Sequence, residues 1–409
     1  TWRCSCVPPA AHVYRARQSL WMVIPNSLER WRPDPETVMQ ISKAILIDKS
    51  IVLRWTDGAE TVYPCLWLRD NDPGAFHPDT RERIFDLLSV DSTITPQGIS
   101  VDGEGQSLML QWPDIEQQSV YPALWLKEHR PGLMLKDASL VEPVLWTAWS
   151  ETDIPRHSAS EILTDPASMQ GFLLNTLRYG ITIVQGLEQS DAAGLDIGAR
   201  IGPMRNSNFG SVFDVISKPD PNNLAYTSGH LPLHTDLPNQ ETPPAFQFLH
   251  CIANDAEGGE SLYCDGFHIA AELRQHKPKT FELLSKIPIP FRFQDDDTDI
   301  RCHRPVIALG ENGSVSMVAW NAHLAGEFDM DERIVDEYYE AYRTFMAMLR
   351  DPSQVVSVKL KAGEMVVFDN RRVLHGRSQF FPNTGNRHLK GYYVDRVDME
   401  SRIRLLSNQ

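Results

Sequence analysis

Three side chains suited to a single metal ion stand at two widely separated places in the chain. His234 and Asp236 flank one residue in the triplet His234-Thr235-Asp236, and His375 lies far downstream. In a β-strand, residues two apart point to the same side, so His234 and Asp236 can converge on one ion while Thr235 turns away. If the three residues act together, the fold must bring the segments around 234 and 375 to one place.

Two imidazoles and one carboxylate hold a metal on one face only. Non-haem Fe(II) oxygenases require that openness, because a chelating co-substrate and dioxygen take the vacant positions. The alternative is chance, since a His-x-Asp triplet and a distant histidine occur together in many unrelated chains. Further features are therefore needed to decide between these interpretations.

Two polar residues favour the metal site. Arg387 stands twelve residues after His375, where a returning strand can bring its guanidinium back to the same pocket. The planar fork of donors suits a carboxylate held by two hydrogen bonds. Ser261 stands twenty-seven residues beyond His234 and can assist the same carboxylate. Taken singly, Arg387 also fits a surface position after a turn at 382–385, and Ser261 fits an ordinary turn residue.

The motifs that carry a family resemblance extend from about residue 45 almost to the end of the chain. Together they resemble the γ-butyrobetaine hydroxylase branch of the taurine-dioxygenase-like Fe(II)/2-oxoglutarate oxygenases. The motifs are Leu66-Trp67-Leu68-Arg69-Asp70-Asn71, His234-Thr235-Asp236, Gly258-Gly259-Glu260-Ser261, Phe368-Asp369-Asn370-Arg371-Arg372-Val373-Leu374-His375 and Arg387-His388-Leu389-Lys390-Gly391-Tyr392-Tyr393.

The resemblance implies a fold that periodicity alone leaves open. Hydrophobic periodicity indicates only the α+β class. The resemblance implies a double-stranded β-helix, or jelly roll, with flanking helices as the catalytic domain over residues 158–409. Such a twisted double sheet can enclose one small ligand and the metal. It also implies Fe(II), 2-oxoglutarate and O2 as the reacting set, with His234, Asp236 and His375 as metal ligands and Arg387 and Ser261 on 2-oxoglutarate.

The region before the catalytic domain divides into three parts. Residues 52–68 and 109–126 form an internal sequence repeat. Each copy has the pattern of a strand, a turn, a second strand and an aromatic end, which predicts a small β-rich domain over residues 38–130. Residues 131–157, rich in proline and tryptophan, are interpreted as a linker packed on a surface. Residues 1–37 form an N-terminal extension without a convincing secretory signal; an organelle-targeting peptide and a start at Met22 stay open.

Composition excludes several classes of partner. A net charge of −15 and a pI near 5.3 argue against nucleic acid, which needs a basic surface. The sequence holds no apolar run of about eighteen residues, which argues against a membrane span. The six cysteines follow no disulfide framework, so we expect a reducing, cytoplasmic location. A small-molecule partner remains, and the resemblance also implies a homodimer.

One departure from the family concerns a zinc site. In the family, a zinc knuckle Cys-Pro-Cys-x-x-Cys follows the Trp-Leu-Arg-Asp-Asn motif of the N-terminal domain. The same place here reads Asp72-Pro73-Gly74-Ala75-Phe76-His77, without any thiolate. Asp72 and His77 cannot rebuild a closed four-ligand site. We therefore predict no structural zinc, and the departure leaves open a divergence from carnitine synthesis.

Aromatic residues match the positions where γ-butyrobetaine hydroxylases keep an aromatic cage. They are Phe209, Phe213, Tyr226 and Tyr393. A trimethylammonium group has no N–H to donate, so it is best held by ring faces. Ordinary core packing is the alternative for each ring, and it weighs more for Phe209 and Phe213 than for Tyr226 and Tyr393.

The anionic end of the substrate needs donors on the other side of the iron. Asn223 matches a polar anchor of the family, and Asn321, His323 and Arg205 are further candidates, with a solvated loop position as the alternative for each. The expected reaction is hydroxylation of a small trimethylammonium acid such as γ-butyrobetaine, which gives carnitine, succinate and CO2. The alternatives are 2-(trimethylamino)ethylphosphonate as substrate, a non-catalytic quaternary-ammonium-binding protein, and a cupin-like hydrolase or isomerase.

Overall fold

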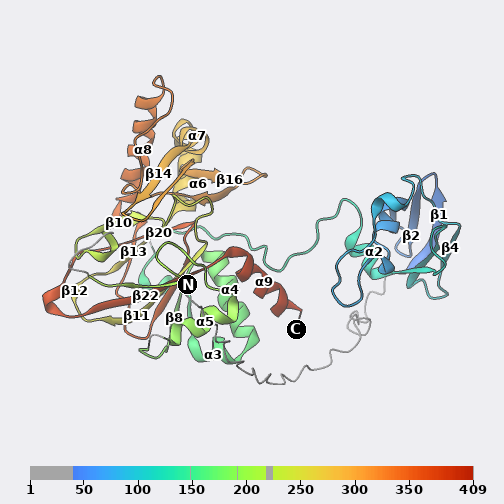
Figure 1. The fold of residues 1–409 in the computed structure, drawn as a ribbon, viewed down its shortest axis with the longest axis horizontal. Helices are drawn as coiled ribbons and strands as arrows, with labels where there is room; N and C mark the ends of the chain where they lie inside the picture. The colour runs from blue at the N-terminus through green and yellow to red at the C-terminus, as the bar shows by residue number, and fades with distance from the viewer. Residues whose placement is uncertain (1–39, 148, 191, 218–223, 409) are drawn as a thin grey trace, which may run out of the picture. The chain divides into compact units, whose positions relative to one another are not determined.

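The computed structural model describes residues 40–147, 149–190, 192–217 and 224–408 (Figure 1). The chain forms two compact units that divide between Lys136 and Asp137. The predicted N-terminal extension, residues 1–37, lies outside the described residues. Within the described ranges, no helix combines the length and the apolar character that crossing a membrane requires.

The first unit consists of two similar halves. Each half is a three-stranded antiparallel sheet followed by a short helix, and the second and third strands with the helix account for the internal sequence repeat. Tyr63 of one half donates to the carbonyl of Leu126 (2.7 Å), and Tyr121 of the other donates to the carbonyl of Leu68 (2.8 Å). The halves therefore support each other's helices. The elements are β1 (Ile41–Ile47), β2 (Ser50–Trp55), β3 (Glu60–Pro64), α1 (Cys65–Asp70), then β4 (Gly98–Val101), β5 (Ser107–Gln111), β6 (Ser119–Pro122), α2 (Ala123–His129), with η1 (Pro73–Ala75) and η2 (Leu87–Ser89) between them.

Hydrogen bonds organise the loop that corresponds to the zinc knuckle. The Asp72 carboxylate caps η1 by accepting from the Gly74 N–H (2.7 Å), and it also accepts from the Ser119 hydroxyl. The Arg69 guanidinium lies 4.2 Å from the centre of the Phe85 ring, a favourable cation–π distance. The absence of zinc stays a prediction, and elemental analysis of the purified protein should find well below one zinc per chain.

The second unit is built around two β-sheets. Six strands follow the order β7-β8-β19-β11-β22-β9, and four follow β10-β20-β13-β18. Apart from the parallel pair β7 and β8, neighbours in these sheets run antiparallel. The strands are β7 (Arg156–Ser158), β8 (Ile181–Gln185), β9 (Val212–Val215), β10 (Leu231–His234), β11 (Phe246–Asn254), β13 (Ser261–Asp265), β18 (Val356–Val358), β19 (Met365–Asp369), β20 (Val373–Arg377) and β22 (Arg387–Val394).

The two faces of the six-stranded sheet have different coverings. Phe246 and Phe248 of β11 belong to a core shared with α3 (Ala159–Thr164), α4 (Pro166–Tyr179), α5 (Ala193–Ile201) and α9 (Arg396–Ser407) (Figure 1). Leu249 and Cys251 belong to a second core, which also contains residues of β13, β18 and β20 from the other sheet. Alternation along the strand thus sends one set of side chains to the helices and the other set between the sheets.

The segment between β13 and β18 carries helices and short hairpins. Its apolar residues form a third core of this unit, against which Leu233 of β10 and Leu374 of β20 also pack. The elements are α6 (Gly266–His276), α7 (Pro278–Lys286), β14 (Ile289–Gln294), β15 (Asp299–Arg304), β16 (Ile307–Leu309), β17 (Val315–Val318), α8 (Val335–Leu349) and η5 (Pro352–Gln354). Elsewhere in the unit lie η3 (Glu151–Asp153), η4 (Leu224–Tyr226), β12 (Glu257–Gly258), β21 (Phe380–Phe381) and η6 (Pro382–Thr384).

Candidate active site around two histidines and an aspartate

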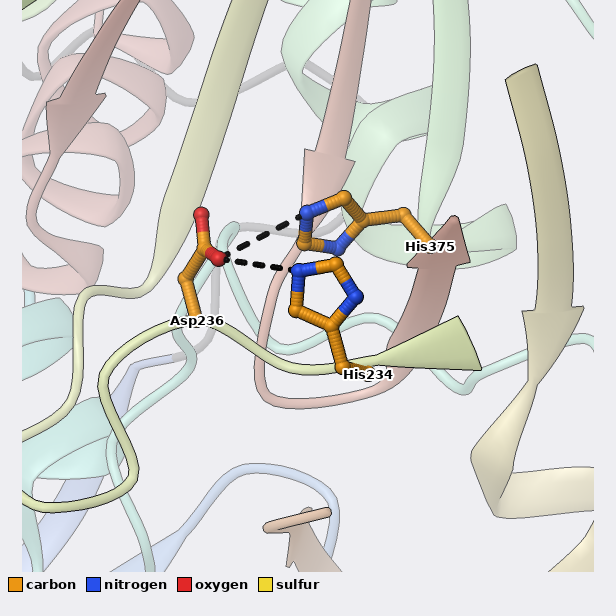
Figure 2. Close-up of side chains that lie close together, drawn as sticks. All are labelled: His234, Asp236 and His375. Carbon is orange, nitrogen blue, oxygen red and sulfur yellow. Dashed lines mark ion pairs between the residues drawn. The ribbon is translucent and has the colours of Figure 1, made fainter. Parts of the chain in front are cut away.

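Strand pairing brings the three candidate ligands together. β10 and β20 run antiparallel with His234 opposite His375. Asp236 Oδ1 lies 3.4 Å from His234 Nε2 and 3.6 Å from His375 Nε2, and the three ligand atoms lie within 4.8 Å of one another (Figure 2). The expectation that His234 and Asp236 share a strand was wrong. β10 ends at His234, and the backbone turns next to Asp236, where Leu237 has a φ of 54°.

The protonation states of these groups suit a metal ion. Burial and the neighbouring His234 lower the pKa of His375 to about 3, so its imidazole is neutral near pH 7. Burial alone would raise the pKa of Asp236, but His375, His234 and the Tyr393 hydroxyl together hold that pKa below its ordinary value. The Nδ1 of His234 lies 2.9 Å from the carbonyl oxygen of Pro232, which assigns the proton to Nδ1 and leaves Nε2 free to bind a metal.

Two outer residues orient the Asp236 carboxylate and backbone. The Tyr393 hydroxyl donates to Asp236 Oδ2 (2.7 Å), which leaves Oδ1 facing the imidazoles. The Asn370 side chain accepts from the Asp236 N–H (2.7 Å) and donates to the Asp236 carbonyl (3.0 Å). The sequence reasoning missed Asn370 in this role, although it lies within the motif that ends at His375.

Arg387 and Ser261 are buried at the starts of β22 and β13. In the described part of the chain, the Arg387 side chain makes one hydrogen bond to the protein, from Nε to the Gly259 carbonyl (3.3 Å). Gly259 has a φ of 74°, and a Cβ there would lie 3.1 Å from the Arg387 side chain, so glycine leaves room for the guanidinium. Burial lowers the pKa of Arg387 from its ordinary value. Because that hydrogen bond uses only Nε, the two Nη groups are available to a ligand as far as the described residues show.

These residues share one cavity of about 360 Å³. That volume suits a small-molecule ligand together with a co-substrate. The lining also contains all four predicted cage rings, and Phe213 lies 5.3 Å from Tyr393 between ring centres. The predicted site residues in the lining are His234, Asp236, His375, Arg387, Ser261, Phe209, Phe213, Tyr226, Tyr393, Asn321 and His323.

Two of the predicted anion anchors, Arg205 and Asn223, are not among the described residues that line the cavity. Arg205 is not part of the cavity lining, because its guanidinium donates to the Asp395 carboxylate (2.8 Å) and to the Gln240 side chain (3.1 Å). The salt bridge to Asp395 occupies the guanidinium and disfavours Arg205 as an anion anchor. Asn223 lies outside the described residues.

The cavity contains polar residues that the sequence reasoning missed. Gln247 lines it from the second position of β11, and an amide between two phenylalanines was a usable signal. Arg292 and Phe293 enter from β14, and the Phe293 ring packs edge-on against Phe209 at 5.5 Å. Arg377 enters from the end of β20. No local sequence pattern predicted that Arg292, Phe293 and Arg377 line the cavity. Their positions depend on how the β14–β15 hairpin and the end of β20 pack.

Comparison with known proteins identifies the family. Residues 159–393 match the model of the taurine catabolism dioxygenase TauD, TfdA family, and residues 46–127 match that of the gamma-butyrobetaine hydroxylase-like N-terminal domain. The chain is 37% identical over 386 residues to gamma-butyrobetaine dioxygenase of Pseudomonas sp. (strain AK-1), covering 93% of this chain and all of that protein. The chain belongs to the TauD/TfdA dioxygenase family.

The comparisons also found a second curated relative and a similar solved structure. Mitochondrial trimethyllysine dioxygenase of Homo sapiens is 32% identical over 360 residues, which cover 84% of this chain and 82% of that protein. The crystal structure of a taurine dioxygenase from Burkholderia xenovorans superposes with a TM-score of 0.45 at 17% identity, covering 56% of this chain and 82% of that one. As a TauD/TfdA protein, this chain is an Fe(II)- and 2-oxoglutarate-dependent dioxygenase.

The Tyr393 hydroxyl offers a direct test of the carboxylate's orientation. Tyr393→Phe should lower the affinity for Fe(II) or Co(II) by about 10- to 100-fold, the usual cost of losing a partner of a metal ligand. Anaerobic metal titration measures this. Tyr392→Phe is the matched control, because the neighbouring hydroxyl donates to the Gly194 carbonyl (2.6 Å) in the helix-side core. Equal metal affinity in Tyr393→Phe and the wild type would contradict the assignment.

Proposed function

We propose that this dioxygenase hydroxylates γ-butyrobetaine to carnitine, with succinate and CO2 as co-products. The observation that carries the proposal is one cavity lined by both a two-histidine, one-carboxylate cluster and the aromatic rings Phe213, Tyr226 and Tyr393. The name and 37% identity of the Pseudomonas relative support the same substrate.

The catalytic roles follow from the donor set. Fe(II) would be held by His234, Asp236 and His375. These residues supply the donor types of non-haem iron sites and leave one face of the metal open. The Arg387 guanidinium and the Ser261 hydroxyl would hold the distal carboxylate of 2-oxoglutarate. When bound, iron and 2-oxoglutarate with O2 supply the oxidising chemistry, and the protein supplies position and a closed site.

The cation would be held by the aromatic rings. Tyr226 and Tyr393 are buried and line the cavity, and Phe213 packs beside Tyr393. Each ring face contributes about 0.5 to 2 kcal/mol to a desolvated cation. Because Tyr393 also donates to Asp236, the cage and the metal site share one residue. The substrate's cationic end would then be fixed at a constant distance from the iron.

The charges around the cavity favour a carboxylate substrate over a phosphonate. Arg292 is paired with the Asp299 carboxylate through two hydrogen bonds (2.7 and 2.9 Å), and Arg377 donates to backbone carbonyls. Burial lowers the pKa of His323, which keeps it neutral. With Arg387 assigned to 2-oxoglutarate and the Arg377 guanidinium bonded to carbonyls of the 225–229 loop, the donors left to face the substrate's anionic end are chiefly the neutral side chains of Asn321 and His323. A monoanion needs less compensation than a dianionic phosphonate.

The deciding experiment offers the two substrates separately. Protein loaded anaerobically with Fe(II) receives O2, 2-oxoglutarate and either γ-butyrobetaine or 2-(trimethylamino)ethylphosphonate. Mass spectrometry follows succinate and a product heavier by one oxygen atom. We expect turnover of γ-butyrobetaine. Turnover of the phosphonate alone would overturn the proposal, and tight binding of either compound without succinate would leave a quaternary-ammonium-binding protein.

Tyr226→Ala tests the cage. Loss of one ring face should raise the KM for γ-butyrobetaine by about 10- to 30-fold, since a desolvated cation–π contact is worth about 2 kcal/mol. The KM for 2-oxoglutarate should change by less than about twofold. Tyr226→Phe keeps the ring face and should stay near the wild type. Equal effects of Tyr226→Ala on both KM values would count against the cage.

The proposal also covers the fold, the domain division, the oligomeric state and the location of the protein. The facing six- and four-stranded sheets, with a shared core between them, support a double-stranded β-helix as the catalytic fold. We keep the proposed division into a β-rich domain over residues 38–130, a linker over 131–157 and a catalytic domain over 158–409. A homodimer and a cytoplasmic location are also kept as proposals, and light scattering of the purified protein measures the first of these.

A further inference from the structure

Arg377 binds a loop through three backbone carbonyls. It is the last residue of β20, two residues after His375, and its side chain is buried. Its Nη1 donates to the carbonyl of Ala225 (3.2 Å), and its Nη2 donates to those of Thr227 and Gly229 (both 2.8 Å). A single side chain of the catalytic sheet therefore fixes the backbone of residues 225–229.

That loop carries a ring of the proposed cage. Tyr226 ends the short helix η4, and its side chain lines the cavity. The loop is held further by the Phe380 N–H, which donates to the Ser228 carbonyl (3.1 Å). Removing the Arg377 guanidinium would take away the hydrogen bonds that it donates to three carbonyls of this loop. Arg377 therefore contributes to the position of the loop that carries Tyr226.

Arg377 also lies next to the residue assigned to 2-oxoglutarate. The guanidinium carbons of Arg377 and Arg387 lie 4.9 and 5.7 Å from the centre of the same Phe380 ring. In the described part of the chain, neither guanidinium forms an ion pair with a carboxylate. Burial and the neighbouring Arg387 lower the pKa of Arg377 to about 10. Two like charges therefore lie against one aromatic ring, and both arginines line the cavity where a dicarboxylate would bind.

We propose that Arg377 is a positioning residue that couples the 2-oxoglutarate site to the substrate cage. This inference rests on the proposed function. A carboxylate at Arg387 relieves the repulsion between the two guanidiniums and so stabilises Arg377 in contact with the 225–229 loop. The loop then holds Tyr226 at the cavity, and the trimethylammonium group binds more tightly. Because such coupling is reciprocal, the substrate also strengthens the binding of 2-oxoglutarate.

Calorimetry measures this coupling without turnover. γ-Butyrobetaine is titrated anaerobically into the full-length, Mn(II)-loaded protein with and without saturating 2-oxoglutarate. In the wild type we expect 2-oxoglutarate to tighten γ-butyrobetaine binding by about fivefold or more, the lower end of typical coupling. Arg377→Gln should weaken γ-butyrobetaine binding and reduce the coupling to less than about twofold. Arg377→Lys, which keeps a charge and some donors, should retain part of it.

Arg274→Gln is the matched control. This arginine also donates to a backbone carbonyl, that of Gly313 (2.8 Å), and lies over an aromatic ring, that of Phe281. It lies outside the cavity lining, so its replacement should leave the coupling unchanged. Thermal melts of all variants report folding. Undiminished coupling in a folded Arg377→Gln protein would overturn the proposal.

Hydrogen exchange separates this inference from the proposed substrate. If the wild type binds no γ-butyrobetaine, the proposed function fails, and exchange of the backbone amides in residues 224–230 then decides the role of Arg377. We expect 2-oxoglutarate to slow exchange there in the wild type and to have no such effect in Arg377→Gln. If 2-oxoglutarate slows exchange equally in both proteins, or in neither, Arg377 does not couple 2-oxoglutarate binding to the loop.

Discussion

His375→Ala should reduce succinate formation to below about one hundredth of the wild-type rate. Loss of a partner of a metal ligand typically costs 10- to 100-fold in metal affinity or activity, and loss of a ligand itself should cost more. His375 faces His234 in the strand register, and its burial keeps it neutral, as a metal ligand must be. The measurement is 2-oxoglutarate- and substrate-dependent succinate release, with anaerobic Fe(II) titration beside it.

The fold should survive this change. β20 is buried along its length and pairs with both β10 and β13, so loss of one imidazole leaves the backbone hydrogen bonds in place. Asp236→Ala should behave in the same way. His303→Ala is the control, because His303 lies on β15, outside the cavity lining, and is paired with Asp329 (2.7 Å). Normal turnover by folded His375→Ala or Asp236→Ala would remove the central assignment.

Arg387→Met should raise the KM for 2-oxoglutarate by at least about 30-fold. Removing one partner of a buried, hydrogen-bonded charge pair costs roughly 2 kcal/mol or more. Methionine fills a similar volume beside Gly259 and Phe380, which limits the loss of packing. The KM for γ-butyrobetaine should change much less, because the cage rings are untouched. Initial rates of succinate release at varied concentrations of each compound give both values.

Two further variants define the role of Arg387. Arg387→Lys keeps the charge without the planar fork, so it should recover only part of the 2-oxoglutarate affinity. Arg205→Met removes an arginine that is paired with Asp395 outside the cavity lining, and it should leave the KM for 2-oxoglutarate unchanged. If Arg387→Met binds 2-oxoglutarate as well as the wild type, the co-substrate is held elsewhere.

Motif chemistry carried most of the site prediction. His234, Asp236 and His375 were recognised because their donor types and spacing are uncommon, and the structure places them together. Arg387 and Ser261 were predicted as 2-oxoglutarate-binding residues from their sequence distances after His375 and His234. These inferences depend on residue type and on the alternation of side chains in strands, both of which can be read locally. Arg205 is disfavoured as an anion anchor because its guanidinium is paired with Asp395 across the fold.

The contacts that orient the site could not be predicted in this way. Tyr393 was expected as a cage ring, but its hydroxyl also reaches Asp236, 157 residues earlier in the chain. Arg377 holds carbonyls about 150 residues earlier, and Arg292 and Phe293 arrive on an inserted hairpin. Each of these contacts depends on strand register and on packing between segments that the local sequence does not relate.

The sequence by itself determined the chemistry of this protein: the metal-binding residue types, the family, the repeated hairpins of the N-terminal unit and the net negative charge. Only the tertiary structure decided which polar groups face the cavity and which are already bound. The physical reason is that a residue type sets what a side chain can bind, whereas the competing partners that satisfy it are set by the folded neighbourhood. Arg205 and Arg377 have the same side chain, and only that neighbourhood gives them different roles.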